Sequence, residues 1–312
     1  MNAVIDTIFS LNTLASAVRL AVPIALASVG GTFSERSGII NIGLEGMILS
    51  GAFAGALGTF ITGNPWLGVF FAMFAGGVLA AIFALFTIDL KANHVVAGVG
   101  VNILASGATA WLMQVIWNRK GTSPGVKGLP EWGIPFIKDI PVIGPLLGEQ
   151  SPLVYVMLII VIASWILLFK TPLGLRIRMT GEHPEAADSL GINIRKIKYF
   201  SVITSGVLSG MGGAYLSLGH LNRFSSGMSA GRGYMALAAN IFGQWNPLGG
   251  LGASFLFSYT DALQMRLQSM NLGIANELIQ MFPYIITVVV IAGAVVRSRP
   301  PEALGEHYDF KK

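Results

Sequence analysis

The stretch that decides the fold reads Ser34-Glu35-Arg36-Ser37-Gly38-Ile39-Ile40-Asn41-Ile42-Gly43-Leu44-Glu45-Gly46 and continues apolar to Ile61. Its first residues, 34–38, predict a short polar loop. The segment that follows is long enough to cross a bilayer, because about 20 apolar residues span one. It nevertheless carries Asn41 and Glu45 near its start. Polar groups at membrane depth are costly, so these two residues need a partner or a function.

The composition of the chain indicates an integral membrane protein. Of its 312 residues, 53% are hydrophobic and only 11% are charged, whereas soluble domains carry roughly 25% charged residues. The 39 glycines suit transmembrane bundles, where small residues let helices approach closely. There is no cysteine, which excludes disulfides, thiolate metal sites and cysteine nucleophiles. We expect an all-α, polytopic fold in a single transmembrane domain over residues 1–312.

Hydrophobic runs predict about eight to ten transmembrane helices, some of them short or broken. Full spans are expected at 11–32, 39–61, 66–88, 92–118, 151–169, 199–219 and 278–296, and one more within the run 234–266. That run is split near 245–250, and its first part, about 233–243, is too short to cross unaided. We expect a short or re-entrant helix there.

Basic residues set the expected topology. The connection 170–198 is rich in lysine and arginine, so the positive-inside rule places it in the cytoplasm, together with the tail from Arg297. The region 118–150, rich in proline and glycine, then lies outside, although it carries four basic residues (Arg119, Lys120, Lys127 and Lys138). The net charge of +5 therefore indicates how the chain is oriented in the membrane, and it does not indicate nucleic-acid binding.

Two glycine-rich segments, 46–58 and 206–219, resemble each other. The likeness is compatible with an internal repeat, a common plan in transporters, where the substrate site lies at the repeat interface. Helices rich in glycine and alanine also resemble one another by chance.

No enzyme motif is present. The sequence has neither a GxxxxGK[ST] phosphate loop nor an HExxH zinc motif, and its four histidines are scattered. Any ATP that drives this protein must therefore be hydrolysed by another chain. We expect this chain to bind no metal and no cofactor of its own.

A set of polar residues is expected at membrane depth. One hypothesis is that they line the route of a hydrophilic substrate; the alternative is that they link or cap helices. Glu45 could line the route, couple protons, or pair with Arg36 or Arg19, and we favour the ion pair. The residues are Asn41, Glu45, Asn93, His94, Asn102, Asn240, Gln244 and Asn246.

The segment 181–192 predicts a helix of about two turns in the central loop, with Pro184 near its start and Gly191 just past its end. So short a helix is not stable alone. Its small apolar face, Ala186, Ala187 and Leu190, needs a partner surface. We favour docking to an ATPase; the alternative is an ordinary surface helix parallel to the membrane.

Four segments together (34–46, 93–102, 181–192 and 240–247) resemble the permease subunits of nucleoside and simple-sugar ABC importers, within the larger ribose and branched-chain amino acid permease group. The resemblance covers nearly the whole chain. It implies a multi-pass subunit of the bacterial inner membrane. The partners implied are a second, similar permease, an ATPase with two nucleotide-binding domains that binds ATP and Mg²⁺, and a substrate-binding lipoprotein outside. The sequence of residues 34–46 is similar to that of the shorter of the two permeases in nucleoside importers.

The resulting hypothesis is a translocation subunit that imports nucleosides with energy from the separate ATPase. Alternatives are a simple-sugar or amino-acid ABC permease, or an ion-coupled secondary transporter that uses Glu45. The expected pathway residues are Asn41, Glu45, Asn93, Asn102, Asn240 and Gln244. By resemblance to the family's coupling helix, the expected ATPase-coupling residues are Gly181, Glu182, Pro184, Glu185, Ala186, Ala187, Leu190 and Gly191.

Overall fold

A computed structural model describes residues 10–133, 148–270 and 299–308, with single positions at 144, 278, 281, 285 and 288. Within these ranges the regular structure is helical, apart from a small antiparallel pairing of β1 (Trp132–Gly133) with β2 (Glu149–Gln150) and an isolated antiparallel bridge between Thr122 and Ser225. The expectation of an all-α membrane fold is confirmed. Apart from the single positions 278, 281, 285 and 288, the predicted span 278–296 falls outside the described residues, as does the predicted outer-loop residue Lys138.

Six helices of the described residues are long and apolar enough to cross a membrane, and each matches a span expected from the sequence. They are α2 (Leu11–Arg36), α3 (Leu44–Thr62), α4 (Pro65–Ala84) with its π-helical extension η1 (Leu85–Asp89), α5 (His94–Trp117), α7 (Pro152–Lys170), and α10 (Ile194–Ala214) with its extension η3 (Tyr215–His220). Four further helices are α8 (Pro172–Glu182), α9 (Pro184–Ser189), α11 (Arg232–Phe242) and α12 (Pro247–Ser269).

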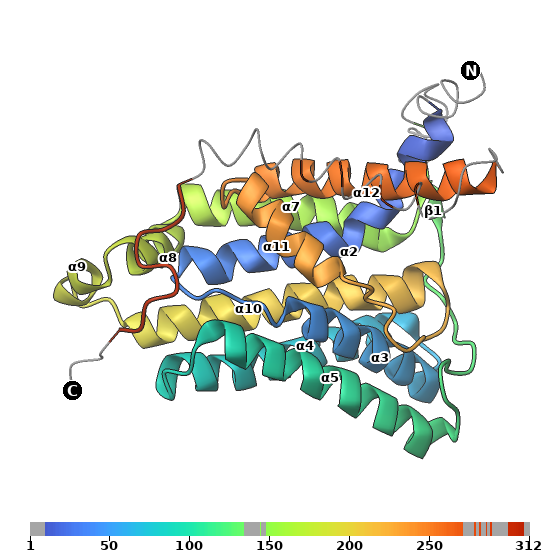
Figure 1. Ribbon diagram of the computed structural model, residues 1–312, viewed down its shortest axis with the longest axis horizontal. Coiled ribbons are helices and arrows are strands. Elements are labelled where there is room, and N and C mark those ends of the chain that lie inside the picture. The colour runs from blue at the N-terminus through green and yellow to red at the C-terminus, as the bar shows by residue number, and fades with distance from the viewer. Residues whose placement is uncertain are drawn as a thin grey trace.

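The long helices lie side by side, with the connections gathered at two ends (Figure 1). One end carries α8, α9 and the C-terminal segment 299–308; the opposite end carries β1 and the adjoining loop. The basic connection between α7 and α10 and the described part of the C-terminal tail therefore lie at the same end, as the positive-inside rule predicts. That this end faces the cytoplasm stays a prediction.

Glycines bring α3, α4 and α10 into direct backbone contact. A Cβ at Gly51 of α3 would lie 2.4 Å from the carbonyl oxygen of Gly210 in α10, and one at Gly76 of α4 would lie 2.1 Å from that of Gly206. The two look-alike segments thus belong to helices that pack against each other. Close packing is one reason for their shared composition, and the internal repeat stays a prediction.

The predicted loop at 34–38 is only partly correct. Helix α2 continues through Arg36, and α3 starts at Leu44 instead of Ile39. The helix can continue because Glu35, although only 3% exposed, finds hydrogen-bond partners on α11 and on the turn before α12. It ends at Arg36, and Gly38, two residues later, has a φ of +92°, the left-handed conformation that favours glycine after a helix.

The short helix expected near 233–243 is confirmed as α11. Its 11 residues extend about 16 Å, roughly half the thickness of a bilayer core. The preceding segment, 221–231, is irregular, with positive φ at Asn222, Gly227, Ala230 and Gly231. Because α11 begins beside the start of α3 and ends beside the end of α2, this part of the chain enters the bundle instead of crossing it as one helix (Figure 1).

Candidate functional site

Helix α11 starts against the carboxylate of Glu45, the second residue of α3. One carboxylate oxygen accepts a hydrogen bond from the Gly231 N–H at 2.8 Å, and the other accepts from the Gly233 N–H at 2.7 Å. The first N–H groups of a helix lack partners within it and carry partial positive charge, so a carboxylate there stabilises the helix. A Cβ at Gly233 would lie 2.3 Å from the Glu45 nitrogen, so glycine permits this approach.

The ion pair of Glu45 with Arg36 or Arg19, which the sequence favoured, is not formed. Arg36 instead donates to the Trp245 carbonyl oxygen at 2.9 Å and lies 3.6 Å from the Glu182 carboxylate. Arg19 donates to the Gln150 side chain at 2.9 Å. A re-entrant helix start gives Glu45 better-placed donors than either distant side chain, and that geometry has no local sequence signature.

Asn102 of α5 completes the junction. Its amide oxygen accepts from the Gly46 N–H at 2.8 Å, and its amide nitrogen donates to the Ile42 carbonyl at 3.0 Å and to the Tyr234 hydroxyl at 3.1 Å. One side chain therefore connects the start of α3, the middle of α5 and the first turn of α11. We name this group the α3–α5–α11 junction; it comprises Glu45, Asn102, Gly231, Gly233 and Tyr234.

The other predicted pathway residues lie apart from this junction. Asn41, which is fully buried, links the segment before α3 to α10 by donating to the Ser205 hydroxyl at 3.0 Å. Asn93 caps α5 by accepting from the N–H groups of the next turn. Gln244 is exposed in the turn after α11, and its carbonyl accepts from Arg36. Their proximity to a substrate route stays a prediction.

A second buried group, which the sequence did not predict, connects α2 with α11. Asn240 donates to the Glu35 carboxylate at 2.8 Å and accepts from the Thr32 hydroxyl at 2.7 Å, and the Trp245 indole also donates to Glu35. Asn240 was expected on the route; it is fully buried here, and both of its side-chain hydrogen bonds, to Glu35 and Thr32, are with α2. Glu35 was assigned to a loop and so overlooked. Residues 21–35 of α2 are buried on every side, so no helical periodicity marks Glu35 and the sequence carries no local signal for it.

The predicted helix of the central loop is confirmed as α9, with Gly191 at φ +74° just beyond it. The expected apolar face is partly wrong. Ala187 is fully buried within this chain, whereas Leu190 is 70% exposed and Ala186 is also exposed. These residues differ in burial because α9, six residues long, lies against its own bundle. It therefore has one inner side, which carries Ala187, and one outer side.

Residues just before α9 attach it to the rest of the protein. A Cβ at Gly181 would lie 2.3 Å from the Arg36 carbonyl oxygen, which shows how closely the end of α8 approaches α2. Glu182 pairs with Arg36, and Pro184 is buried. Of the eight expected coupling residues, Gly181, Glu182 and Pro184 thus position the helix. Three others, Glu185, Ala186 and Leu190, have side chains on its outer side.

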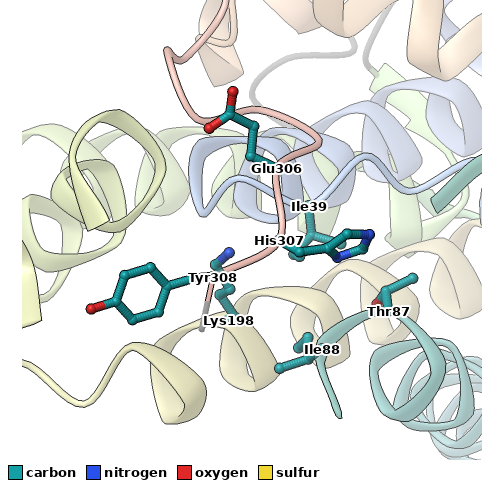
Figure 2. Close-up of a pocket in the computed structure, with 7 residues that line it drawn as sticks. All are labelled: Ile39, Thr87, Ile88, Lys198, Glu306, His307 and Tyr308. Carbon is teal, nitrogen blue, oxygen red and sulfur yellow. The ribbon is translucent and has the colours of Figure 1, made fainter. Parts of the chain in front are cut away.

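The C-terminal segment 299–308 runs across this end. The Ala303 N–H donates to the Gly181 carbonyl at 2.9 Å, the Gly305 N–H donates to the Gly38 carbonyl at 3.0 Å, and the Tyr308 hydroxyl donates to Asp188 of α9 at 2.9 Å. Figure 2 shows the Lys198 side chain of α10 beside Tyr308 of this segment. The Glu306 carboxylate points away from Lys198. The segment therefore fastens α9 to the bundle.

Known proteins are similar to this chain over nearly its whole length. The guanosine ABC transporter permease NupQ of Bacillus subtilis is 39% identical over 300 residues, which cover 92% of this chain and 93% of NupQ. The nucleoside ABC transporter permease NupC of Lactococcus lactis is 36% identical, with the same coverage of both chains. TsgC13 of Haloferax volcanii, named as a glucose ABC transporter permease, is 34% identical over 96% of this chain and 98% of its own.

A solved structure shows the fold as well. A metal-chelate type ABC transporter in an inward-facing conformation matches with a TM-score of 0.50 over 91% of this chain and 85% of that chain, at 15% identity. The model of the family described as branched-chain amino acid transport system / permease component matches residues 13–291. Such permeases are translocation subunits, and ATP hydrolysis belongs to a separate ATPase. This chain is therefore a multi-pass membrane protein that belongs to the permease family of the branched-chain amino acid transport systems.

Proposed function

We propose that this chain is a translocation subunit of an ABC importer that carries nucleosides. The observation that supports it best is the identity of 36–39% to guanosine and nucleoside permeases over 92% of the chain. The chemistry is compatible: few polar groups among many aliphatic ones suit a ligand that has apolar ring faces and hydrogen-bonding edges. A simple sugar is the second candidate, because of the 34% identity to TsgC13.

The proposal includes the partners. The chain pairs with a second, similar permease in the bacterial inner membrane, and an extracytoplasmic lipoprotein delivers the substrate. ATP and Mg²⁺ bind to the ATPase subunit, which carries two nucleotide-binding domains, and this chain binds no cofactor. The tight hydrogen bonding of both Glu45 oxygens supports ATP-driven over ion-coupled transport, because a coupling carboxylate must release its partners in every cycle.

Substrate choice can be tested by competition. In cells that express the complete complex, uptake of radiolabelled guanosine should be inhibited by excess unlabelled guanosine and uridine and unaffected by ribose or glucose. No guanosine uptake above background, together with saturable uptake of radiolabelled glucose, would favour the sugar candidate. The same cells with an inactive ATPase provide the background.

We further propose that α9 docks onto the ATPase through its outer side, Glu185, Ala186 and Leu190. Replacing Leu190 with aspartate should reduce the amount of ATPase that co-purifies with the permeases by about tenfold or more, because a desolvated apolar anchor commonly contributes more than 1.4 kcal/mol. The measurement is the ATPase-to-permease ratio after affinity purification through the permease.

Leu221→Asp is the matched control, since Leu221 is also an exposed leucine but follows η3 at the opposite end of the bundle. It should leave the ratio unchanged. Equal recovery of the ATPase with Leu190→Asp would exclude α9 as the docking element. Ala187 is unsuitable for this test, because its burial would make any substitution destabilising.

A further inference from the structure

One face of the bundle combines irregular backbone with exposed polar groups. It is formed by the segment 226–231, the first turn of α11 and the adjoining side of α5. Ser226, Gly227, Ala230 and Tyr234 are exposed there, as is Ser106 of α5. Three residues of the segment have positive φ, namely Gly227, Ala230 and Gly231, so its backbone cannot form a regular helix.

The inner part of this face, at Asn102 and Tyr234, lies at membrane depth, whereas Ser226 lies at its outer end, because its N–H donates to the Gly121 carbonyl oxygen in the loop after α5 at 2.7 Å. Asn102, which donates to the Tyr234 hydroxyl, is eight residues beyond the first residue of α5, about 12 Å along the helix axis. The bilayer core is about 30 Å thick, so the junction lies well inside it. Irregular backbone is tolerated at such depth only where protein buries it or where it borders a water-filled cavity. Lipid is therefore excluded as the surroundings of this face.

The opposite kind of surface is present on α4 and α10. A shallow groove there is lined by Phe70, Phe74, Val78, Ile203 and Val207, together with further apolar side chains, and its backbone is regular helix. Nothing in that groove needs water. The two faces thus differ in both side-chain polarity and backbone regularity.

Tyr234 is the most prominent side chain of the polar face. It is 49% exposed, and its hydroxyl accepts a hydrogen bond from Asn102. The amide orientation of Asn102 is fixed, because its oxygen accepts from Gly46 and its nitrogen donates to Ile42. The Tyr234 hydroxyl therefore acts as the acceptor in this bond. Its own O–H donor has no hydrogen-bond acceptor among the described residues. An exposed ring with a free donor suits a ligand that has a flat face and acceptor atoms beside it.

We propose that the segment 226–231, Ser106 and Tyr234 line the translocation route, and that Tyr234 contacts the ring of the passing nucleobase. The base stacks on the phenol ring, and the hydroxyl, which lies in the plane of that ring, donates to an oxygen of the attached sugar. Asn102 acts as a positioning residue that holds the phenol. The choice of ligand rests on the proposed nucleoside import; the location of the route does not.

The location can be tested by cysteine accessibility, for which this chain is well suited because it has no cysteine of its own. In the assembled complex, Ser226→Cys, Ser106→Cys and Tyr234→Cys should react with a membrane-impermeant charged methanethiosulfonate, detected as a mass shift of this chain. Phe74→Cys and Val78→Cys of the apolar groove should not react. Ser226→Cys, at the outer end of the face, is the accessible reference, and absence of labelling at both Ser106→Cys and Tyr234→Cys, as expected for burial against the second permease, would overturn the proposal.

The role of Tyr234 can be tested by guanosine uptake through the complete complex. Tyr234→Leu should raise the KM for uptake about tenfold, the effect typical of losing one base–aromatic stack. Tyr234→Phe, which keeps the ring and loses only the donor, should retain most of the uptake with a smaller rise in KM. The amount of assembled complex should be the same in all three proteins.

Unchanged KM in Tyr234→Leu, with normal wild-type uptake, would overturn the contact while leaving the proposed function intact. A wild-type complex that imports no nucleoside would instead refute the proposed function, and the cysteine labelling would still decide whether this face borders the route. A fall in assembled complex that accounts for all of the lost uptake, with unlabelled Tyr234→Cys, would reduce Tyr234 to a structural role.

Discussion

Replacing Gly51 with alanine should destabilise the transmembrane bundle by about 3 kcal/mol, the upper end of the cost of overpacking a core. The new Cβ would lie 2.4 Å from the Gly210 carbonyl oxygen and 2.5 Å from the Gly210 Cα. Both contacts are with backbone, so no side-chain rotation relieves them and α3 must move away from α10. The measurement is the midpoint of thermal unfolding of the purified complex in detergent.

Gly252→Ala provides the matched control for this prediction. Gly252 also lies within a helix, α12, but a Cβ there has no neighbouring atom within 4 Å. Alanine should be neutral or slightly stabilising, because it favours a helix interior by up to about 1 kcal/mol over glycine. Equal midpoints for the Gly51 and Gly252 variants would contradict the close approach of α3 and α10.

Replacing Glu45 with alanine should cost the protein about 3 kcal/mol, because it removes a charged acceptor from two backbone N–H groups, each such bond contributing roughly 1.5–3 kcal/mol. Helix α11 would lose the carboxylate at its N-terminus and with it the anchor of the re-entrant segment. Glu45→Gln should lie between alanine and wild type, since an amide oxygen can still accept one of the bonds. Stability can be followed by protease resistance near 221–231 and by thermal unfolding.

Glu131→Ala, at an exposed carboxylate, should change neither measurement. The Glu45 variants also separate a structural role from ion coupling. If Glu45 were a proton or sodium site, Glu45→Gln would abolish uptake while leaving stability unchanged. We expect instead that Glu45→Gln lowers stability, and that uptake falls only in proportion to the loss of assembled complex.

Much of the fold could be predicted from the sequence because the strongest signal, uninterrupted hydrophobicity, is local. All six membrane-spanning helices of the described residues, the short α11 and the small helix α9 were expected near their observed positions. The boundaries at 34–44 were less accurate. A charged Glu35-Arg36 pair normally ends a membrane helix, and only contacts with residues more than 200 positions away allow α2 to continue.

The polar residues were recognised more easily than their partners. Glu45 and Asn102 were predicted to matter, and both belong to the α3–α5–α11 junction. Their partners, Gly231, Gly233 and Tyr234, were not predicted, because a carboxylate that caps a distant helix start leaves no spacing pattern in the sequence. The favoured ion pair of Glu45 was wrong for the same reason: charge complementarity suggested arginine, whereas the geometry provides backbone N–H groups.

The central claim is that this chain is the translocation subunit of an ATP-driven nucleoside importer. Its most direct test is uptake of radiolabelled guanosine into proteoliposomes that contain both permeases and the ATPase, with the binding lipoprotein and guanosine on the outside, ATP and Mg²⁺ inside, and ion gradients dissipated by ionophores. We predict uptake that requires ATP and every subunit. Uptake by this chain alone, or uptake that needs a proton gradient and no ATP, would contradict the claim.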